Sequence, residues 1–465
     1  MGISEGSEEE LSGETTKLWL YLFAFWSQFK PSEPFLVDYL IEEKGITSQQ
    51  VYQNILDLFV YSRLPLVIIA GFCAELECCG CRAVLLAGAF CGAATVLLTR
   101  FGTALWLLQA SQFTVSAAFA SRISVASMAF AMSLPSRFQE AIHTLKAVTL
   151  FSNCCAAALG EVLRDMGSPL SLLFNLSFVG QALSLLCAAA LPLAPRPPIV
   201  ATPTSAHRLV GSNLDERLLS TGSKIGVLGT FKALLRDLWL SLWLRRVMWW
   251  TAWALVMNPV HGLTLTYWQS MVRSKHILKD HNGYLSACMY LAAAVLTLLA
   301  GRAAAMQRAT SLLVTGSVLL AGWLLLQLAQ ADDTRQVTVY GWILLYQCLF
   351  EATTAVATFQ VGAEVTRATA ASHSKALHSA EVRRLPRSVR LTLLFSTTTV
   401  LVAAAESGIL LVINGWSSMD TRFHSLGLCL CIVGFLLSAF AFAEAAAWRQ
   451  PSEPPKSGEG LKNVG

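Results

Sequence analysis

The sequence has 465 residues, of which 54% are apolar and only 14% are charged, and its mean hydropathy is +0.54. A soluble protein of this length needs more charged residues to cover its surface, so the composition indicates an integral membrane protein. The net charge of +5 is small and is distributed over loops, which argues against a nucleic-acid partner.

Long apolar runs are the dominant pattern along the chain. A bilayer core about 30 Å thick is crossed by roughly 20 helical residues. Runs of this length predict an all-α membrane protein with about twelve transmembrane helices in two groups of six. The first group covers residues 17–40, 52–76, 83–99, 103–134, 141–165 and 169–193. The second group covers residues 246–272, 284–305, 311–330, 337–362, 389–413 and 423–448.

The two groups define an N-terminal bundle, 17–193, and a C-terminal bundle, 246–448. The polar, proline-containing segment 194–245 between them is expected to be a cytosolic linker. Its last part has apolar residues at helical spacing among lysines and arginines, which predicts an interfacial helix. The acidic segment 1–16 lacks the features of a signal peptide. It and segment 449–465 are expected to be disordered tails.

The distribution of Lys and Arg predicts the orientation in the membrane. Basic residues concentrate in the central linker and in the loop 363–388, so both termini are expected to be cytosolic. Two six-helix halves joined by a long cytosolic loop resemble the major facilitator superfamily, whose halves rock about a site near the middle of the membrane. Without a retention signal, the plasma membrane is the expected location.

The first apolar run is interrupted by two prolines, Pro31 and Pro34, that flank Ser32 and Glu33. Proline breaks the hydrogen bonding of a helix, and broken helices occur at membrane depth where the backbone lines a cavity. The run continues to Tyr39 and beyond, which favours a cavity position for Glu33. The alternative is a helix that ends near residue 30, with Glu33 among the outer headgroups.

Arg122 lies inside the fourth run, with weakly polar residues on both sides. A charged side chain at the centre of a membrane helix costs about 2.5–3.5 kcal/mol by insertion scales, so it needs a partner or a wet cavity. The guanidinium fork matches carboxylates, which predicts an organic anion as its ligand. The alternative is an internal ion pair that only stabilises the bundle, with Glu33 as a candidate partner.

Glu406, Glu351 and His261 are further ionisable residues inside predicted spans. Glu406 is expected either to serve function, by holding a proton or facing the centre, or to pair with a cation. Glu351 is a similar acid that could pair with a neighbouring helix. His261, near Pro259, is interpreted mainly as a helix-packing residue, with a proton relay as the alternative.

No motif predicts catalysis, a cofactor or a metal. The chain has no nucleophile elbow, zinc-protease, phosphate-loop or dinucleotide motif, and its soluble segments are too short for an enzyme domain. The cluster Cys73, Cys78, Cys79 and Cys81 lacks a second cysteine pair or nearby histidines. We therefore interpret it as a short turn between helices and not as a zinc site.

Residues 30–40, KPSEPFLVDYL, resemble the first-span signature of the reduced folate carrier family, which transports folates and thiamine. Residues 122–139, RISVASMAFAMSLPSRFQ, are similar to the family's fourth span and the loop that follows it. Further similarities lie at Asn282, Gly283, 357–360, Arg390, Phe395 and Thr399. The resemblance covers most of the chain at low identity and implies a major-facilitator fold.

The resemblance also implies substrate-binding roles. The family's first-span glutamate corresponds to Glu33, and the span-four position, which is Arg in folate carriers and Glu in thiamine carriers, is Arg122 here. Lys146 stands where folate carriers have an arginine, and Tyr267 matches an aromatic residue that could stack on a flat ring. Arg390 is included in the expected site.

Two positions depart from the family pattern. Gln112 replaces a glutamate found in both branches, and Glu406 replaces the lysine of folate carriers or the glutamine of thiamine carriers. Both are retained as candidate site residues. Glu406 is the main objection to a folate dianion, and it could suit a zwitterion or a proton-coupled cycle.

The leading expectation is therefore a folate importer that works by alternating access. Its expected partners are the vitamin, the lipid bilayer and a counter-transported anion or a proton. The first alternative is a carrier of thiamine or another cationic vitamin, in which Glu33 and Glu406 face the cation. A second alternative is a membrane scaffold or receptor without transport, whose mid-span charges would form closed ion pairs.

Overall fold

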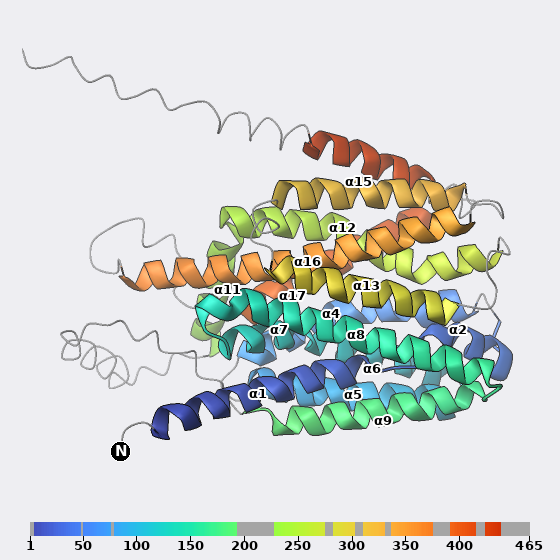
Figure 1. The fold of residues 1–465 in the computed structure, drawn as a ribbon, viewed down its shortest axis with the longest axis horizontal. Helices are drawn as coiled ribbons and strands as arrows, with labels where there is room; N and C mark the ends of the chain where they lie inside the picture. The colour runs from blue at the N-terminus through green and yellow to red at the C-terminus, as the bar shows by residue number, and fades with distance from the viewer. Residues whose placement is uncertain are drawn as a thin grey trace, which may run out of the picture.

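The computed structural model describes most of the chain and is almost entirely helical in that part (Figure 1). The described residues are 4–47, 50–75, 79–192, 227–274, 282–302, 310–330, 336–374, 391–414 and 424–438. Most of the predicted linker and the whole predicted tail 449–465 lie outside these ranges.

The helices of the first half follow the predicted apolar runs. They are α1 (Ser4–Gln28), α4 (Asp57–Glu75), α5 (Gly80–Phe101), α6 (Leu105–Ser121), α7 (Ile123–Ala131), α8 (Phe138–Asp165) and α9 (Leu170–Ala190). Helix α1 begins at Ser4, inside the segment 1–16 that was expected to be a disordered tail. Several glutamates occupy this start, and glutamate both favours helix formation and complements the positive end of the helix dipole.

The second half begins with the helix predicted at the end of the linker. Its helices are α11 (Val227–Leu242), α12 (Arg245–Ser274), α13 (Asn282–Arg302), α15 (Thr310–Ala329), α16 (Gln336–Ser374), α17 (Leu391–Asn414) and the helix His424–Ser438. Helix α16 continues into the predicted loop 363–388, where Glu364 and Arg367 form an ion pair one turn apart on the same helix.

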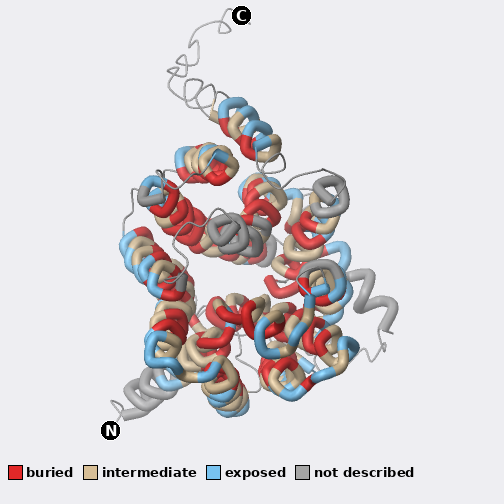
Figure 2. The backbone as a smooth tube through the Cα atoms, turned by 90° about the vertical axis from the view of Figure 1, so that its right-hand side faces the viewer, coloured by how far each residue is buried: buried red, intermediate tan, exposed pale blue. Residues whose placement is uncertain are grey.

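Within the described ranges, nine helices are long and apolar enough to cross a membrane. Large apolar side chains are exposed on their outer surfaces, including Phe90, Trp106, Phe113, Leu186 and Leu312. Buried residues face the middle of the bundle, as Figure 2 shows. Apolar outer surfaces on long helices are expected where lipid replaces water, so the chain is a multi-pass membrane protein. A total of twelve spans stays a prediction.

The first span is broken where the two prolines predict it. Helix α1 ends at Gln28, and the chain continues through the turn η1 (Glu33–Phe35), the short α2 (Leu36–Asp38) and the π-helical turn η2 (Tyr39–Glu43). The backbone N–H of Ser32 donates to Ser177 Oγ at 3.1 Å, so a side chain from α9 satisfies part of the broken backbone.

A second break, which the sequence pattern does not predict, lies at Arg122 between α6 and α7. The Arg122 N–H donates to the Phe119 carbonyl at 3.2 Å, and the Val125 N–H donates to the Arg122 carbonyl at 3.0 Å. These bonds join residues three apart and tighten the backbone relative to an α-helix. Arg122 therefore lies at a corner of the predicted fourth span, which contains no proline or glycine to indicate a break.

Helices α8 and α13 lie side by side and join the two halves (Figure 1). At one end, the Gly283 N–H donates to Glu161 Oε2 at 2.7 Å. At the other end, Gln139 Nε2 donates to the Gly301 carbonyl at 2.7 Å. Helix α4 packs against α17 in a second contact between the halves.

Close approach at the second of these ends requires a glycine. A Cβ atom added at Gly301 would lie 2.7 Å from His143 Cβ, whereas one added at Gly341 on α16 would meet nothing within 4 Å. We expect Gly301→Ala to cost roughly 1–3 kcal/mol, because the two helices must separate. Thermal unfolding of the purified protein measures this, with Gly341→Ala as the matched control. Equal stability of the two variants would contradict the tight α8–α13 contact.

Candidate functional site

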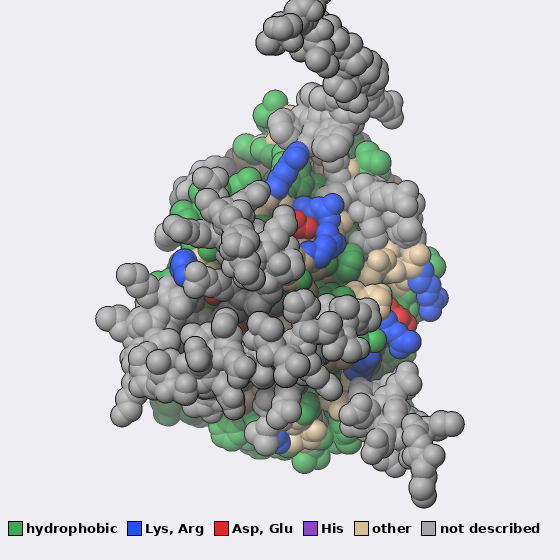
Figure 3. Space-filling model, turned by 90° about the vertical axis from the view of Figure 1, so that its left-hand side faces the viewer, with side chains coloured by type: hydrophobic (Ala, Val, Ile, Leu, Met, Phe, Trp, Pro, Cys, Tyr) green, Lys and Arg blue, Asp and Glu red, His purple; other side chains and the backbone are tan. Residues whose placement is uncertain are grey.

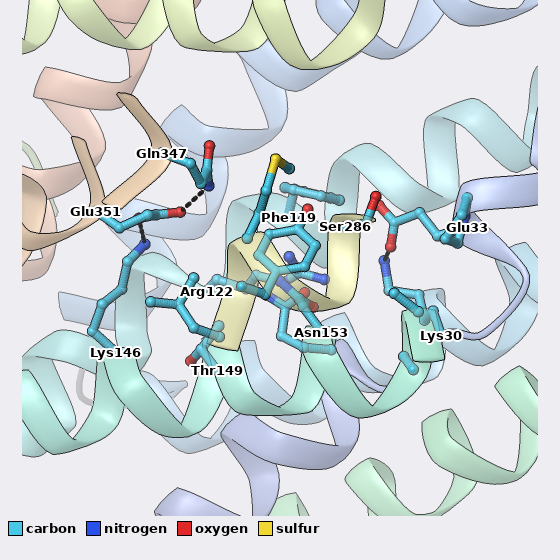
Figure 4. Close-up of a pocket in the computed structure, with 17 residues that line it drawn as sticks. Lys30, Glu33, Phe119, Arg122, Lys146, Thr149, Asn153, Ser286, Gln347 and Glu351 are labelled. Carbon is cyan, nitrogen blue, oxygen red and sulfur yellow. Dashed lines mark hydrogen bonds and ion pairs between the residues drawn. The ribbon is translucent and has the colours of Figure 1, made fainter. Parts of the chain in front are cut away.

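A cavity of about 400 Å³ lies between the two halves of the bundle. Its volume falls in the range of about 300–1,000 Å³ that is typical of small-molecule sites. Five structural elements contribute to its wall: the broken end of α1, α6, α8, α13 and α16. The polar and aromatic residues that line it are Gln28, Lys30, Glu33, Phe119, Arg122, Lys146, Thr149, Asn153, Ser286, Tyr290, Gln347 and Glu351 (Figure 4). We call this the central cavity.

A second cavity of about 240 Å³ adjoins the central cavity and shares Gln28, Arg122, Lys146 and Thr149 with it. Its other lining residues are mostly apolar and small, among them Ala24, Ala126 and Ala355. Arg122 and Lys146 therefore border open space on two sides. A ligand longer than one cavity could extend from one into the other past these two cations.

Two ion pairs occupy opposite ends of the central cavity, as Figure 4 shows. Lys30 Nζ lies 2.8 Å from Glu33 Oε2, and Lys146 Nζ lies 2.6 Å from Glu351 Oε2. The second pair joins α8 of the first half to α16 of the second. Gln347 Nε2 donates to the other carboxylate oxygen of Glu351 at 3.1 Å.

Arg122 lies between these two pairs and differs from both lysines. Among the described residues, no carboxylate lies within 4.0 Å of its guanidinium. The guanidinium centre lies 4.0 Å from the centroid of the Phe119 ring, and Nη2 donates weakly to the Ser27 carbonyl at 3.5 Å. An aromatic ring and one carbonyl leave most of the five N–H donors of this guanidinium for a ligand.

Arg122 and Glu33 do not form the direct ion pair that was the alternative to a ligand-binding role. Glu33 pairs instead with Lys30, three residues away in the sequence, and 53% of its side chain is exposed. Helix α1 ends at Gln28, close to residue 30, where it was expected to end if Glu33 lay among the outer headgroups. Glu33 nevertheless borders the central cavity.

Glu406 lies apart from the central cavity. It pairs with Arg63 of α4 across the two halves, and both line a third cavity of about 260 Å³ with Asn258, His261, Gly262, Thr398, Thr399 and Val402. This cavity shares no lining residue with the central one. The His261 ring stacks on Phe350, with 3.8 Å between ring centroids.

Three other candidate residues have different outcomes. Gln112 is buried in α6, where its amide donates to Ser111 Oγ at 3.3 Å, and it does not line the central cavity. Tyr267 belongs to α12, but its side chain is outside the described part, and Arg390 falls outside it altogether. Cys78 is also outside the described residues, and the described Cys73, Cys79 and Cys81 are not in disulfides.

Several residues of the central cavity were not expected to be site residues. Lys30 belongs to the proline-broken segment, so its position beside Glu33 could have indicated it. Glu351 was expected only to pair with a neighbour. Asn153, Thr149 and Tyr290 are polar or aromatic residues in apolar runs, a signal too common to select them. Their selection depends on which face of each helix meets the cavity.

Comparison with known proteins gives a consistent result over most of the chain. Residues 14–372 match the model of a family described as reduced folate carrier. A folate-like transporter of Dictyostelium discoideum is 23% identical over 426 residues, which cover 89% of this chain and 64% of that protein. A reduced folate transporter of Rattus norvegicus is 24% identical over 457 residues, which cover 90% of this chain and 80% of that protein.

A thiamine transporter 2 of Mus musculus is 27% identical over 164 residues, only 34% of this chain and 32% of that protein. The chain thus spans less than two thirds of the length of both the Dictyostelium and the thiamine relatives. Among solved structures, a POT family transporter aligns with a TM-score of 0.58 at 13% identity, covering 92% of this chain and 96% of its own. The human organic anion transporter MFSD10 aligns with a TM-score of 0.54 at 16% identity, covering 92% and 98%. These similarities show the fold.

Proposed function

Because the chain belongs to the reduced folate carrier family, we propose that it carries folates across a membrane by alternating access. The predicted family resemblance and major-facilitator fold are both confirmed. The observation that carries the proposal is the Arg122 guanidinium, which borders two cavities and has no described carboxylate within 4.0 Å. A partly buried cation that borders open space without a carboxylate partner suits an anionic ligand.

The central cavity offers groups that complement a folate. The two carboxylates of its glutamate tail would contact Arg122 and Lys146, of which Arg122 provides the bidentate fork. The exposed Glu33 carboxylate would accept hydrogen bonds from the N–H-rich edge of the pterin. The Tyr290 ring lines the same cavity and would contact the flat part of the ligand.

Thiamine suits this arrangement less well. The cationic alternative depends on Glu33 and Glu406 acting together on one positive charge, but these residues line separate cavities. Each of them also pairs with a cation of the protein, Lys30 and Arg63 respectively. The unpaired charge in the central cavity is positive, and it would repel a cationic ligand.

The arrangement of the halves supports transport over a scaffold role. A scaffold would need no open cavity, and its mid-span charges would close into ion pairs. Here the central cavity lies between the halves, and its walls come from both. The contacts α8–α13 and α4–α17 provide the interfaces about which the halves would rock.

We further propose a plasma-membrane location with both termini in the cytosol. Figure 3 shows the end of the molecule at the left of Figure 1, from which α1 starts, and Lys and Arg side chains gather on its described surface. Helix α11, which contains Arg236, and the start of α12, which contains Arg246, lie at this end (Figure 1). Positive charge at one end is the pattern of a cytosolic face.

The substrate is tested by measuring uptake of radiolabelled folic acid and thiamine side by side in proteoliposomes that contain the purified protein. We expect saturable folic acid uptake, inhibited by excess unlabelled folic acid and unaffected by excess thiamine. Folic acid should also raise the unfolding temperature of the protein, since a ligand that binds the folded state stabilises it. Uptake of thiamine alone would favour the cationic alternative, and stabilisation without uptake would favour a receptor.

A further inference from the structure

Two ion pairs with buried carboxylates cross between the halves, and both have the same polarity. In each, the cation belongs to the first half and the carboxylate to the second: Lys146 with Glu351, and Arg63 with Glu406. The carboxylate side chains are only 8% and 9% exposed, respectively. By contrast, Lys30 and Glu33 belong to one half, and Glu33 is 53% exposed.

An ion pair between two moving halves is sensitive to what enters between them. Removing one partner of a buried pair leaves an uncompensated charge, which is strongly unfavourable. Of the two pairs, only Lys146–Glu351 lines the central cavity, so only this pair can meet the substrate directly. A substrate carboxylate that binds Lys146 would take the place that Glu351 now occupies.

The surroundings of Glu351 provide little to replace Lys146. Gln347 on the same helix donates one neutral hydrogen bond. Besides Lys146 of α8, the described ionisable groups that interact electrostatically with Glu351 or share its cavity are Tyr290 of α13, His261 of α12, Arg122 at the α6–α7 corner, Lys30 and Glu33 near the end of α1, and Tyr346 and Cys348 of α16 itself. Arg122 is the cation expected to bind the substrate. His261 lies in the third cavity and stacks on Phe350.

We propose that Glu351 is the site of a co-transported proton, so that the protein moves its anionic substrate together with H⁺. This inference rests on the proposed function. A substrate carboxylate binds the Lys146 ammonium and displaces Glu351. The released Glu351 carboxylate then forms an O–H bond with a proton from water in the cavity, while Lys146 keeps its own proton.

Release reverses these steps on the other side of the membrane. When the substrate leaves Lys146, the Glu351 O–H bond breaks, the proton passes to water, and the carboxylate returns to Lys146. One proton therefore crosses with each substrate molecule bound at Lys146. The neutral acid removes the penalty of an unpaired buried carboxylate while the loaded halves move.

The experiment uses the purified full chain in proteoliposomes with the membrane potential clamped at zero and radiolabelled folic acid as the probe. With one proton per substrate, an inward gradient of about one pH unit should drive about tenfold accumulation. The Glu351→Gln side chain cannot gain or lose a proton, so this variant should abolish the accumulation. Its exchange rate should also fall. The readout is the ratio of accumulation with and without the gradient, which does not depend on the amount of active protein.

Glu406→Gln is the matched control, because it changes an equally buried carboxylate in the other pair between halves. We expect this variant to keep the accumulation ratio of the original chain. If the original chain exchanges folic acid at equal pH but shows no response to the gradient, proton coupling is overturned and the transport proposal stands. If it shows no exchange at any pH, the proposed function itself fails. Unchanged accumulation by Glu351→Gln, or loss in Glu406→Gln alone, would overturn the assignment to Glu351.

Discussion

Arg122→Glu is expected to lower folic acid uptake by about 100-fold or more. Removing one member of a buried charge pair costs roughly 2–5 kcal/mol, and each 1.4 kcal/mol corresponds to about tenfold in affinity. Here the variant also places a carboxylate beside the carboxylates of the ligand. Among the described residues, Arg122 has a cation–π contact with the Phe119 ring and a weak hydrogen bond to the Ser27 carbonyl, and it forms no ion pair, so its loss should not leave a protein acid unpaired.

The measurement compares uptake per molecule of protein at the cell surface, so that uptake is separated from folding and delivery. Arg122→Lys should reduce uptake by about tenfold, because the charge remains but the fork is lost. Arg302→Glu is the matched control, since it makes the same charge reversal at an exposed end of α13. If the Arg122→Glu variant takes up folic acid as fast as the Arg302→Glu variant, the main support for the proposed function is lost.

Glu406→Leu is expected to cost roughly 2–4 kcal/mol of stability, because it leaves the largely buried Arg63, whose side chain is 16% exposed, without its partner. The double variant Arg63→Met/Glu406→Leu should recover most of that loss, since an apolar pair of similar volume carries no desolvation penalty. A double-mutant cycle on thermal or denaturant unfolding of the purified protein measures the coupling between the two positions.

The same double variant tests whether Glu406 takes part in substrate binding. Because the Arg63–Glu406 pair lines the third cavity, we expect folic acid uptake per folded molecule to change by less than about threefold, an effect below one kcal/mol. A much larger loss of uptake in a stable double variant would mean that Glu406 does reach the substrate. Losses that simply add, without recovery in the double variant, would contradict the ion pair.

The sequence by itself determined that the chain crosses a membrane several times, because hydropathy and length are local properties of each segment. Pro31 and Pro34 likewise predicted the break after α1, since a missing N–H disrupts helical bonding in any tertiary context. The isolated charge of Arg122 indicated a cavity or a partner for the same kind of reason, because the membrane penalises that charge wherever the helix lies.

Only the tertiary structure decided which of these charges meet. Lys146 and Glu351 lie on helices of different halves, and their contact depends on how α8 and α16 are rotated and how far the halves have closed. The same packing directs Glu406 to Arg63 and buries Gln112 away from the central cavity, outcomes that no spacing along the chain encodes. The corner at Arg122 also arises without proline or glycine, because contacts with other helices outweigh weak local preferences there.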